Sequence, residues 1–297
     1  IEKAREIRKE GNELFLISND ILYRFRQSGE FVCRITDPEE ISVAGYVVNP
    51  ANRELIVLGN RDDIFYYTFD GQLKQKKKLK SDFSNYQVKS LSMVGELIYT
   101  IEERATLVAD TQEVIIEQQL VAYDSHFREV ESRRLQAVDV GRNRVMPNRQ
   151  HPHLYQNKQS GLVTAYAPST DHDQLLRDTL YVYGSYRQQE ADAARGMSSL
   201  LCPFVTGSRF WLSWHYSEGE DAADYVYYYD THYHSYHVAQ GGLRDDYYKT
   251  GMVSHLAPMD LEGRLFSYCK SGEEVRSAFP DHHSGNAVVF IVQLKEA

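Results

Sequence analysis

The sequence predicts an all-β fold, a six-bladed β-propeller of four-stranded antiparallel blades, the last of them incomplete. Three observations lead to this prediction. Short apolar strands recur, and Leu14, Leu55 and Leu97 mark equivalent positions 41 and 42 residues apart. Propeller blades repeat every ~40–50 residues. Many of these strands are apolar on both faces, and tight turns such as Asp70-Gly71 reverse the chain directly after them.

The stretch DIFYYTF at 63–69 shows why two apolar faces matter. A half-buried strand alternates apolar with polar residues, because only one of its faces meets a core. A middle strand of a blade lies between two neighbouring blades, so both of its faces must be apolar. We therefore place this stretch as the third strand of the second blade, and we expect Tyr67 and Phe69 to be buried.

The same order of parts continues along one predicted domain, 1–297. Each pair of middle strands has a candidate first strand upstream; for the first pair this is AREIRK at 4–9, although its charge makes it a poor strand. Charged or polar runs such as the Lys-rich stretch 74–80 fit the outer fourth strand, where charge blocks edge pairing. The approximate blades are 1–36, 37–80, 81–135, 145–192, 197–240 and 248–297. No outer strand follows 286–292, so the last blade should have three strands or borrow residues 1–5.

Composition excludes some partners. With 33 Lys and Arg against 42 Asp and Glu, the net charge is −9, which argues against a nucleic-acid partner. No stretch approaches ~18 consecutive apolar residues, so no transmembrane segment is expected. Cys33, Cys202 and Cys269 show no zinc-site spacing. Buried free thiols are the simplest interpretation, and pairing of any two of them stays open.

The first two repeats resemble a known family. LISNDILYRFRQSGEFVCRI and VLGNRDDIFYYTFDGQLKQKKKL, together with the ending NAVVFIVQLKEA, resemble the NHL-like six-bladed β-propellers of Bacteroides-type bacteria. The resemblance implies an exported protein of the periplasm or outer cell envelope, with room for a lipid anchor upstream of Ile1. The link at 36–46 departs from the family pattern, so no catalytic residue is carried over.

Long insertions between the second and third strands suggest where a site could lie. We interpret 102–118, 168–177, 217–223 and 270–285 as loops at one equivalent place of blades three to six. Loops on a rigid scaffold often carry function. We therefore expect one elaborated face of the propeller.

Histidines are frequent in these loops and near the expected central channel. The candidate ligand-binding residues are His151, His153, His172, His215, His255, His282 and His283. In 231–238, His232 and His234 should share one strand face. No spacing supports a metal site, and we predict no metal and no cofactor.

Two classes of function fit this pattern. The first is an exported, non-enzymatic binding propeller of the cell envelope, with a glycan, peptide or protein as its ligand. The alternative is a hydrolase or lyase with a site at the mouth of the central channel. Fold alone does not decide between them.

Overall fold

The computed structural model describes most of the two ends of the chain and parts of its middle. The described residues are 4–60, 63–79, 86–109, 114–139, 153–157, 162–167, 179–183, 189–190, 197–206, 209–218, 221–230, 233–253, 256–259, 265–280 and 287–293. The chain divides into two compact units. The first comprises Ile1–Lys77, Asp224–Tyr227 and Tyr236–Ala297, and the second comprises Lys78–Ala223 and Tyr228–Ser235.

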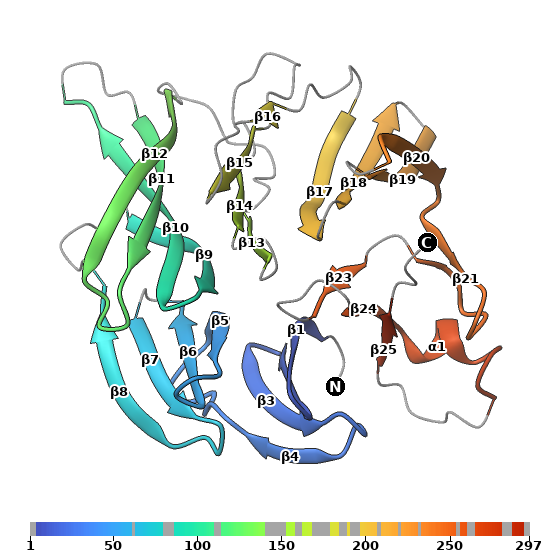
Figure 1. Cartoon of the computed structure of the whole chain (residues 1–297), viewed down its shortest axis with the longest axis horizontal. Helices are drawn as coiled ribbons and strands as arrows, with labels where there is room; N and C mark the ends of the chain where they lie inside the picture. The colour runs from blue at the N-terminus through green and yellow to red at the C-terminus, as the bar shows by residue number, and fades with distance from the viewer. Residues whose placement is uncertain are drawn as a thin grey trace. The chain divides into compact units, whose positions relative to one another are not determined.

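The first two sheets each contain four antiparallel strands in chain order (Figure 1). The first sheet consists of β1 (Arg5–Glu10), β2 (Glu13–Ser18), β3 (Ile21–Arg26) and β4 (Phe31–Arg34). The second consists of β5 (Val43–Asn49), β6 (Glu54–Gly59), β7 (Asp63–Thr68) and β8 (Leu73–Lys78). The run AREIRK therefore does form the first strand, and DIFYYTF supplies the third strand of the second sheet, as predicted.

Facing aromatic and aliphatic side chains fill the space between these two sheets. Phe15 of β2 packs its ring 4.8 Å from that of Phe69, which follows β7. Tyr67 and Phe69 are each 3% exposed, which confirms the burial expected of a two-faced strand. The buried Tyr46 of β5 donates its hydroxyl to the Phe15 carbonyl at 2.8 Å, and so ties the second sheet to the first.

The turn after β7 requires glycine. Gly71 has a φ of 82°, and a Cβ there would lie 3.1 Å from the carbonyl oxygen of Arg34. Both constraints favour a residue without a side chain. The preceding Asp70 accepts a hydrogen bond from Arg24 of β3 at 2.6 Å, so this turn also joins the two sheets.

The central sheets follow the same plan. The third, in the order β12-β11-β10-β9, contains β9 (Tyr86–Val94), β10 (Leu97–Leu107), β11 (Val114–Tyr123) and β12 (Glu129–Asp139). The fourth contains β13 (His153–Asn157), β14 (Leu162–Ala167), β15 (Thr179–Tyr183) and β16 (Gln189–Glu190). The fifth contains β17 (Met197–Thr206), β18 (Arg209–Glu218), β19 (Asp221–Asp230) and β20 (Ser235–Gln240).

Two predicted loops are largely strand, and the prediction is wrong there. Most of 102–118 continues β10 and β11, which pair from Ile98↔Tyr123 to Leu107↔Val114. Its charged residues are tolerated because they find partners: Glu102 is 1% exposed and accepts hydrogen bonds from Tyr123 and Thr100. Likewise, β18 reaches Glu218 and β19 begins at Asp221, so 217–223 is mainly strand. The insertion at 168–177 lies outside the described residues.

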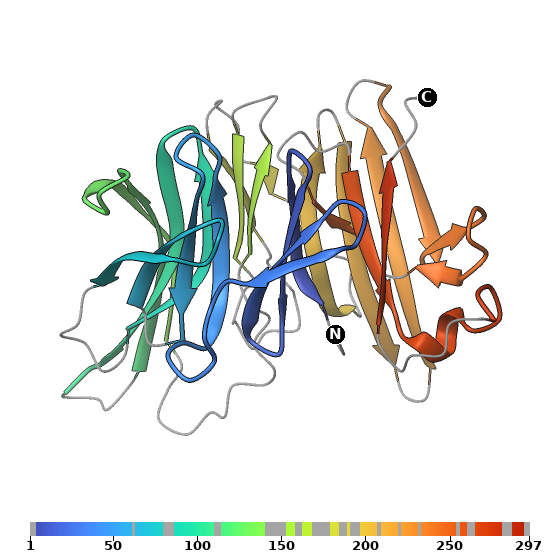
Figure 2. The same ribbon diagram turned by 90° about the horizontal axis from the view of Figure 1, so that it is seen from below.

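The C-terminal part contains a small hairpin and the last sheet. The hairpin consists of β21 (Leu243–Asp245) and β22 (Gly251–Val253). In the described residues, the last sheet has three strands, as predicted: β23 (Ala257–Pro258), β24 (Leu265–Lys270) and β25 (Val288–Gln293). The short helix α1 (Gly272–Val275) follows β24. It lies beside the last sheet in both views (Figure 1, Figure 2).

Sheets from the two ends of the chain pack against each other within the first unit. Ile7, Leu14 and Leu16 of the first sheet share a buried cluster with Met259, and Val289 and Ile291 of the last sheet pack on it. The Lys9 amide also donates to the Met259 carbonyl at 2.9 Å. Apolar faces on both sides of the middle strands thus meet neighbouring sheets, which is the packing of a β-propeller. The count of six blades and the single-domain boundaries stay predictions.

Two of the three cysteines are described in detail. Cys33 and Cys269 have free thiols; Cys33 is half-buried and Cys269 is exposed. The predicted burial is therefore wrong for both, and the side chain of Cys202 is not described. His234 has a φ of 50° and precedes β20, so the predicted strand face with His232 is wrong at His234.

No helix in the described part of the chain is long and apolar enough to cross a bilayer.

Candidate functional site

The seven predicted ligand-binding histidines stay untested. His151, His172, His255, His282 and His283 lie outside the described residues. His153 lies on β13 and His215 on β18, in strands whose side chains are not described. In the remainder, no three or more His, Cys, Asp or Glu side chains gather as a metal site would require.

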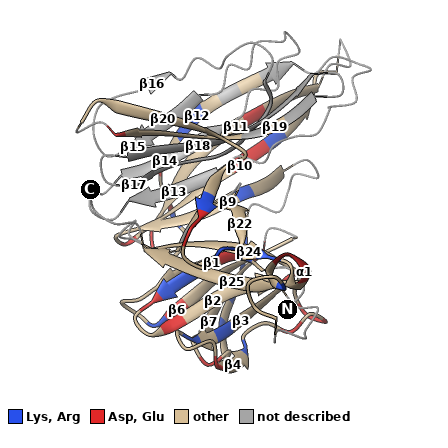
Figure 3. Ribbon diagram, turned by 90° about the vertical axis from the view of Figure 1, so that its right-hand side faces the viewer, with Lys and Arg blue, Asp and Glu red and all other residues tan. Residues whose placement is uncertain are grey.

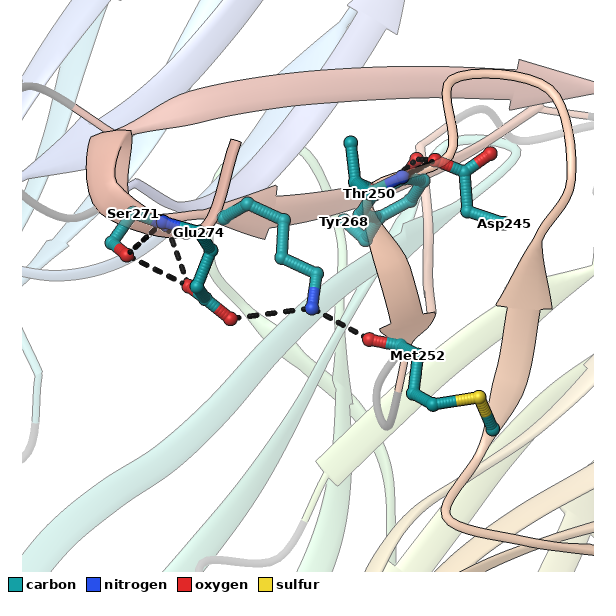
Figure 4. A network of polar contacts seen from close by, with 7 residues as sticks. Asp245, Thr250, Met252, Tyr268, Ser271 and Glu274 are labelled. Carbon is teal, nitrogen blue, oxygen red and sulfur yellow. Dashed lines mark hydrogen bonds and ion pairs between the residues drawn. The ribbon is translucent and has the colours of Figure 1, made fainter. Parts of the chain in front are cut away.

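The best-defined polar cluster surrounds Asp245, at the end of β21 (Figure 4). One carboxylate oxygen accepts hydrogen bonds from the backbone amides of Tyr247 at 3.1 Å and Tyr248 at 2.9 Å. The other accepts from the amide of Thr250 at 3.1 Å and from its hydroxyl at 2.5 Å. The Tyr268 hydroxyl of β24 donates to the same oxygen at 2.9 Å. One carboxylate therefore folds the hairpin loop and ties it to the last sheet.

This arrangement favours the ionised carboxylate. Partial burial of Asp245 opposes ionisation, but the hydrogen bonds from Thr250 and Tyr248 outweigh it and lower the pKa to about 2. Burial is the first cause of the opposite shift at Tyr268, whose pKa rises to about 12. At neutral pH the hairpin is therefore closed by a charged acceptor and a neutral hydroxyl donor.

Lys270 forms a second polar connection, which joins β22 of the hairpin to α1. Lys270, the last residue of β24, donates to the Met252 carbonyl of β22 at 2.6 Å and lies 3.2 Å from Glu274 of α1. Ser271 caps α1 by accepting from the Glu274 amide, while Glu274 accepts from the Ser271 amide at 2.8 Å. These bonds lower the pKa of Glu274, the one from the Ser271 backbone foremost. The hairpin, β24 and α1 thus form one connected unit.

Aromatic rings from the hairpin and from the segment after α1 contact one another at this cluster. Tyr247 meets Tyr248 edge to face at 4.7 Å, and Tyr248 lies 6.1 Å from Phe279, which follows α1. The ring of Phe290 on β25 contacts the Tyr248 ring, with centroids 5.1 Å apart, and stacks on the Tyr268 ring, with centroids 4.8 Å apart. Tyr247 is 84% exposed and Phe279 is 37% exposed. We call Tyr247, Tyr248 and Phe279 the aromatic platform.

Charged residues lie close to the platform residues in the sequence. Arg244 and Asp246 form an exposed ion pair at 3.3 Å beside Tyr247 in the sequence. The helix α1 carries two acidic residues, Glu273 and Glu274, and its ribbon is partly red in Figure 3; Phe279 follows them in the sequence. Aromatic area within a polar rim is typical of sites that bind by stacking and orient the ligand by hydrogen bonds.

Sequence reasoning missed this hairpin. The predicted sixth blade, 248–297, contains no separate hairpin, whereas the structure gives Gly251–Val253 to the hairpin and Ala257–Pro258 to the last sheet. A signal was present in GGLRDDYYKTG at 241–251: a glycine pair, an aspartate that can accept from later amides, and a closing glycine. The described part of the predicted 270–285 insertion contains Phe279 of the platform.

The sheet packing described above and the shared fold of solved structures define the class of protein, a β-propeller. The chain is similar to an oligogalacturonate lyase solved with manganese, with a TM-score of 0.51 and 13% identity over 86% of this chain and 67% of that one. An oligogalacturonate lyase from Vibrio parahaemolyticus gives a TM-score of 0.50 and 12% identity, over 86% of this chain and 67% of the lyase. The β-propeller domain of Cps50 (Swd1) from Myceliophteria thermophila aligns with 98% of this chain and 96% of its own at 8% identity, with a TM-score of 0.45. At these identities the likeness shows the fold alone. No protein-family model and no curated protein sequence matches the chain.

Proposed function

We propose that the protein is a binding propeller that captures its ligand on the aromatic platform. The observation that carries the proposal is Tyr247, which is 84% exposed while Asp245 holds its backbone amide and Tyr248 contacts its ring edge to face. A large ring held in place before binding loses little conformational freedom when a ligand stacks on it. An exposed aromatic side chain with no such anchoring would lose more.

The ligand we propose is a glycan, peptide or protein segment that presents a flat apolar face. Ring stacking supplies contact area, and the charged rim supplies orientation. Export and attachment to the cell envelope belong to the same proposal and rest on the resemblance of the first two repeats. The negative net charge of −9 makes a polyanionic nucleic acid a poor partner.

A ligand panel with a matched pair of variants tests the proposal. The panel contains neutral oligosaccharides, uronic-acid oligosaccharides and peptides rich in Tyr or Pro, scored first by ligand-induced thermal shift and then by calorimetry. We expect one class to bind and Tyr247→Ala to weaken it about tenfold or more, since buried aromatic anchors contribute ~1–3 kcal/mol. The control Phe31→Ala removes a ring that is 56% exposed on β4 of the first sheet and is not part of the platform, and should leave affinity unchanged.

Two results would count against this function. Equal losses in Tyr247→Ala and Phe31→Ala would show that the platform is not the site. Release of new reducing ends or cleaved peptides during incubation, retained in Tyr247→Ala, would favour the hydrolase or lyase alternative instead.

A further inference from the structure

The outer strand of the fifth sheet has unusual chemistry for its position. In the part of the chain that the structure describes, β20 is the terminal strand of the sheet β17-β18-β19-β20. The strands β8 and β12 occupy the same terminal position in the second and third sheets. A terminal strand presents backbone groups that can pair with a strand from another chain unless charge or a cover prevents it.

Charge protects the edges β8 and β12 but is missing from β20. Four of the six residues of β8 are lysine, in the stretch LKQKKK. Five of the eleven residues of β12 are charged, in EVESRRLQAVD. By contrast, β20 reads SYHVAQ and contains no Lys, Arg, Asp or Glu. The usual barrier to edge pairing is therefore present on β8 and β12 and absent from β20.

Exposed apolar side chains add to this contrast. Tyr236 is 67% exposed and Val238 is 52% exposed. They are two residues apart on a strand, so they project from the same face. The Tyr236 ring stacks on Tyr227 of β19 at 6.2 Å, which fixes one side of it and leaves the rest open to contact. Apolar groups that adjoin on one exposed face are the kind of contiguous surface through which chains associate.

We propose that β20 pairs edge to edge with β20 of a second copy of this chain. Antiparallel pairing around a twofold axis at His237 sets Tyr236 opposite Val238 of the other copy, twice. Aromatic and β-branched residues opposite each other are a favourable cross-strand pair. The strand carries no Lys, Arg, Asp or Glu, and only His237 meets its own copy at the axis, whereas two copies of β8 would set lysines against lysines. A twofold dimer is also the commonest closed assembly.

The test is the oligomeric state of the full chain as a function of concentration. Sedimentation and light scattering should show a monomer–dimer equilibrium, and Val238→Lys should raise the dimer dissociation constant tenfold or more. The control Val130→Lys changes a residue 60% exposed on the already charged edge β12, and should leave the equilibrium as it is. In the wild type, amide hydrogen exchange should slow in β20 as concentration rises, a readout that does not depend on any variant folding.

Several results would overturn the proposal. These are a wild-type protein that stays monomeric at every concentration, a dimer that Val238→Lys leaves intact, or exchange in β20 that ignores concentration. Protection of β20 by an added extended peptide, with the protein alone monomeric, would assign the edge to a peptide instead. The aromatic platform plays no part in this pairing, so Tyr247→Ala should leave the dimer unchanged.

Discussion

The turn after β7 and the β21–β22 hairpin contain similar residues, but the first joins two sheets and the second exposes an aromatic side chain. Each contains an aspartate, a nearby glycine with positive φ and several aromatic residues. Asp70 binds Arg24 of the neighbouring sheet at 2.6 Å, and the rings beside it are buried. Asp245 mainly binds the amides of its own loop, and Tyr247 is left outside. The partners of the aspartate therefore decide whether the nearby aromatic rings are buried or exposed. Asp70 binds a neighbouring sheet, whereas Asp245 binds mainly its own loop.

The largest effect should come from the buried side of this comparison. Phe69→Ala removes a ring that is 3% exposed and packs on Phe15. We expect the free energy of unfolding to fall by about 3–5 kcal/mol, as for other large-to-small core changes. Urea denaturation measures it. Phe31→Ala, at a position 56% exposed, should change stability by only ~0.5 kcal/mol, and an equal loss in both variants would contradict the packing.

A smaller loss is expected from the polar link between the first two sheets. Arg24 donates to Glu13 at 2.7 and 2.8 Å and to Asp70 at 2.6 Å. Arg24→Met keeps most of the apolar stem and removes these bonds, so unfolding free energy should fall by about 1.5–3 kcal/mol. Arg26→Met is the control, because its 3.5 Å contact with Glu30 joins two exposed side chains. Equal urea midpoints for the two variants would show that the link contributes little.

The hairpin should respond to pH through Asp245. Its folded pKa of about 2 lies below the ordinary value of 3.8, so the ionised form stabilises the folded hairpin above about pH 4. That contribution is lost as pH falls through about 2. Asp245→Asn should remove the pH dependence and speed hydrogen exchange at the Tyr247, Tyr248 and Thr250 amides.

The matched control is Asp246→Asn, which changes a neighbour whose side chain is 85% exposed. This variant should keep the acid-induced opening of the wild type. Parallel exchange profiles for Asp245→Asn and the wild type between pH 2 and pH 4 would refute the role given to this carboxylate. The effect should be local, and smaller than that of Phe69→Ala on global unfolding.

Sequence reasoning was most accurate where local pattern and packing agree. The strand β7 was placed as a third strand because its two apolar faces and the Asp70-Gly71 turn are both readable within a few residues. It failed where burial depends on distant partners. Glu102 was assigned to a loop because it falls in the long insertion 102–118, but Tyr123 of the next strand donates a hydrogen bond that lets it lie buried in β10.

The candidate site was only partly predictable for the same reason. The insertion at 270–285 was found by its length, yet Asp245 is linked to Tyr268, a partner 23 residues away. No periodicity in 241–251 indicates that pairing. The seven histidines were chosen by residue type and position in the repeat, and they stay predictions. Insertion length thus pointed to one segment of the candidate site, while the fold brings its other residues, such as Asp245 and Tyr268, together with it.

The smallest effect should come from the cap of α1. Ser271→Ala removes the acceptor for the Glu274 amide and the hydroxyl that donates to its carboxylate at 2.9 Å. A lost N-cap costs about 0.5–2 kcal/mol, and the low end is expected for a helix of four residues. Hydrogen exchange at the Phe279 amide, which donates to Val275 at 2.8 Å, should quicken while the urea midpoint barely moves. Ser271→Asn should restore protection, because asparagine is an equally good cap. Unchanged exchange in Ser271→Ala would mean that the contacts of Phe279 with Tyr248 and Phe290 hold this segment without the cap.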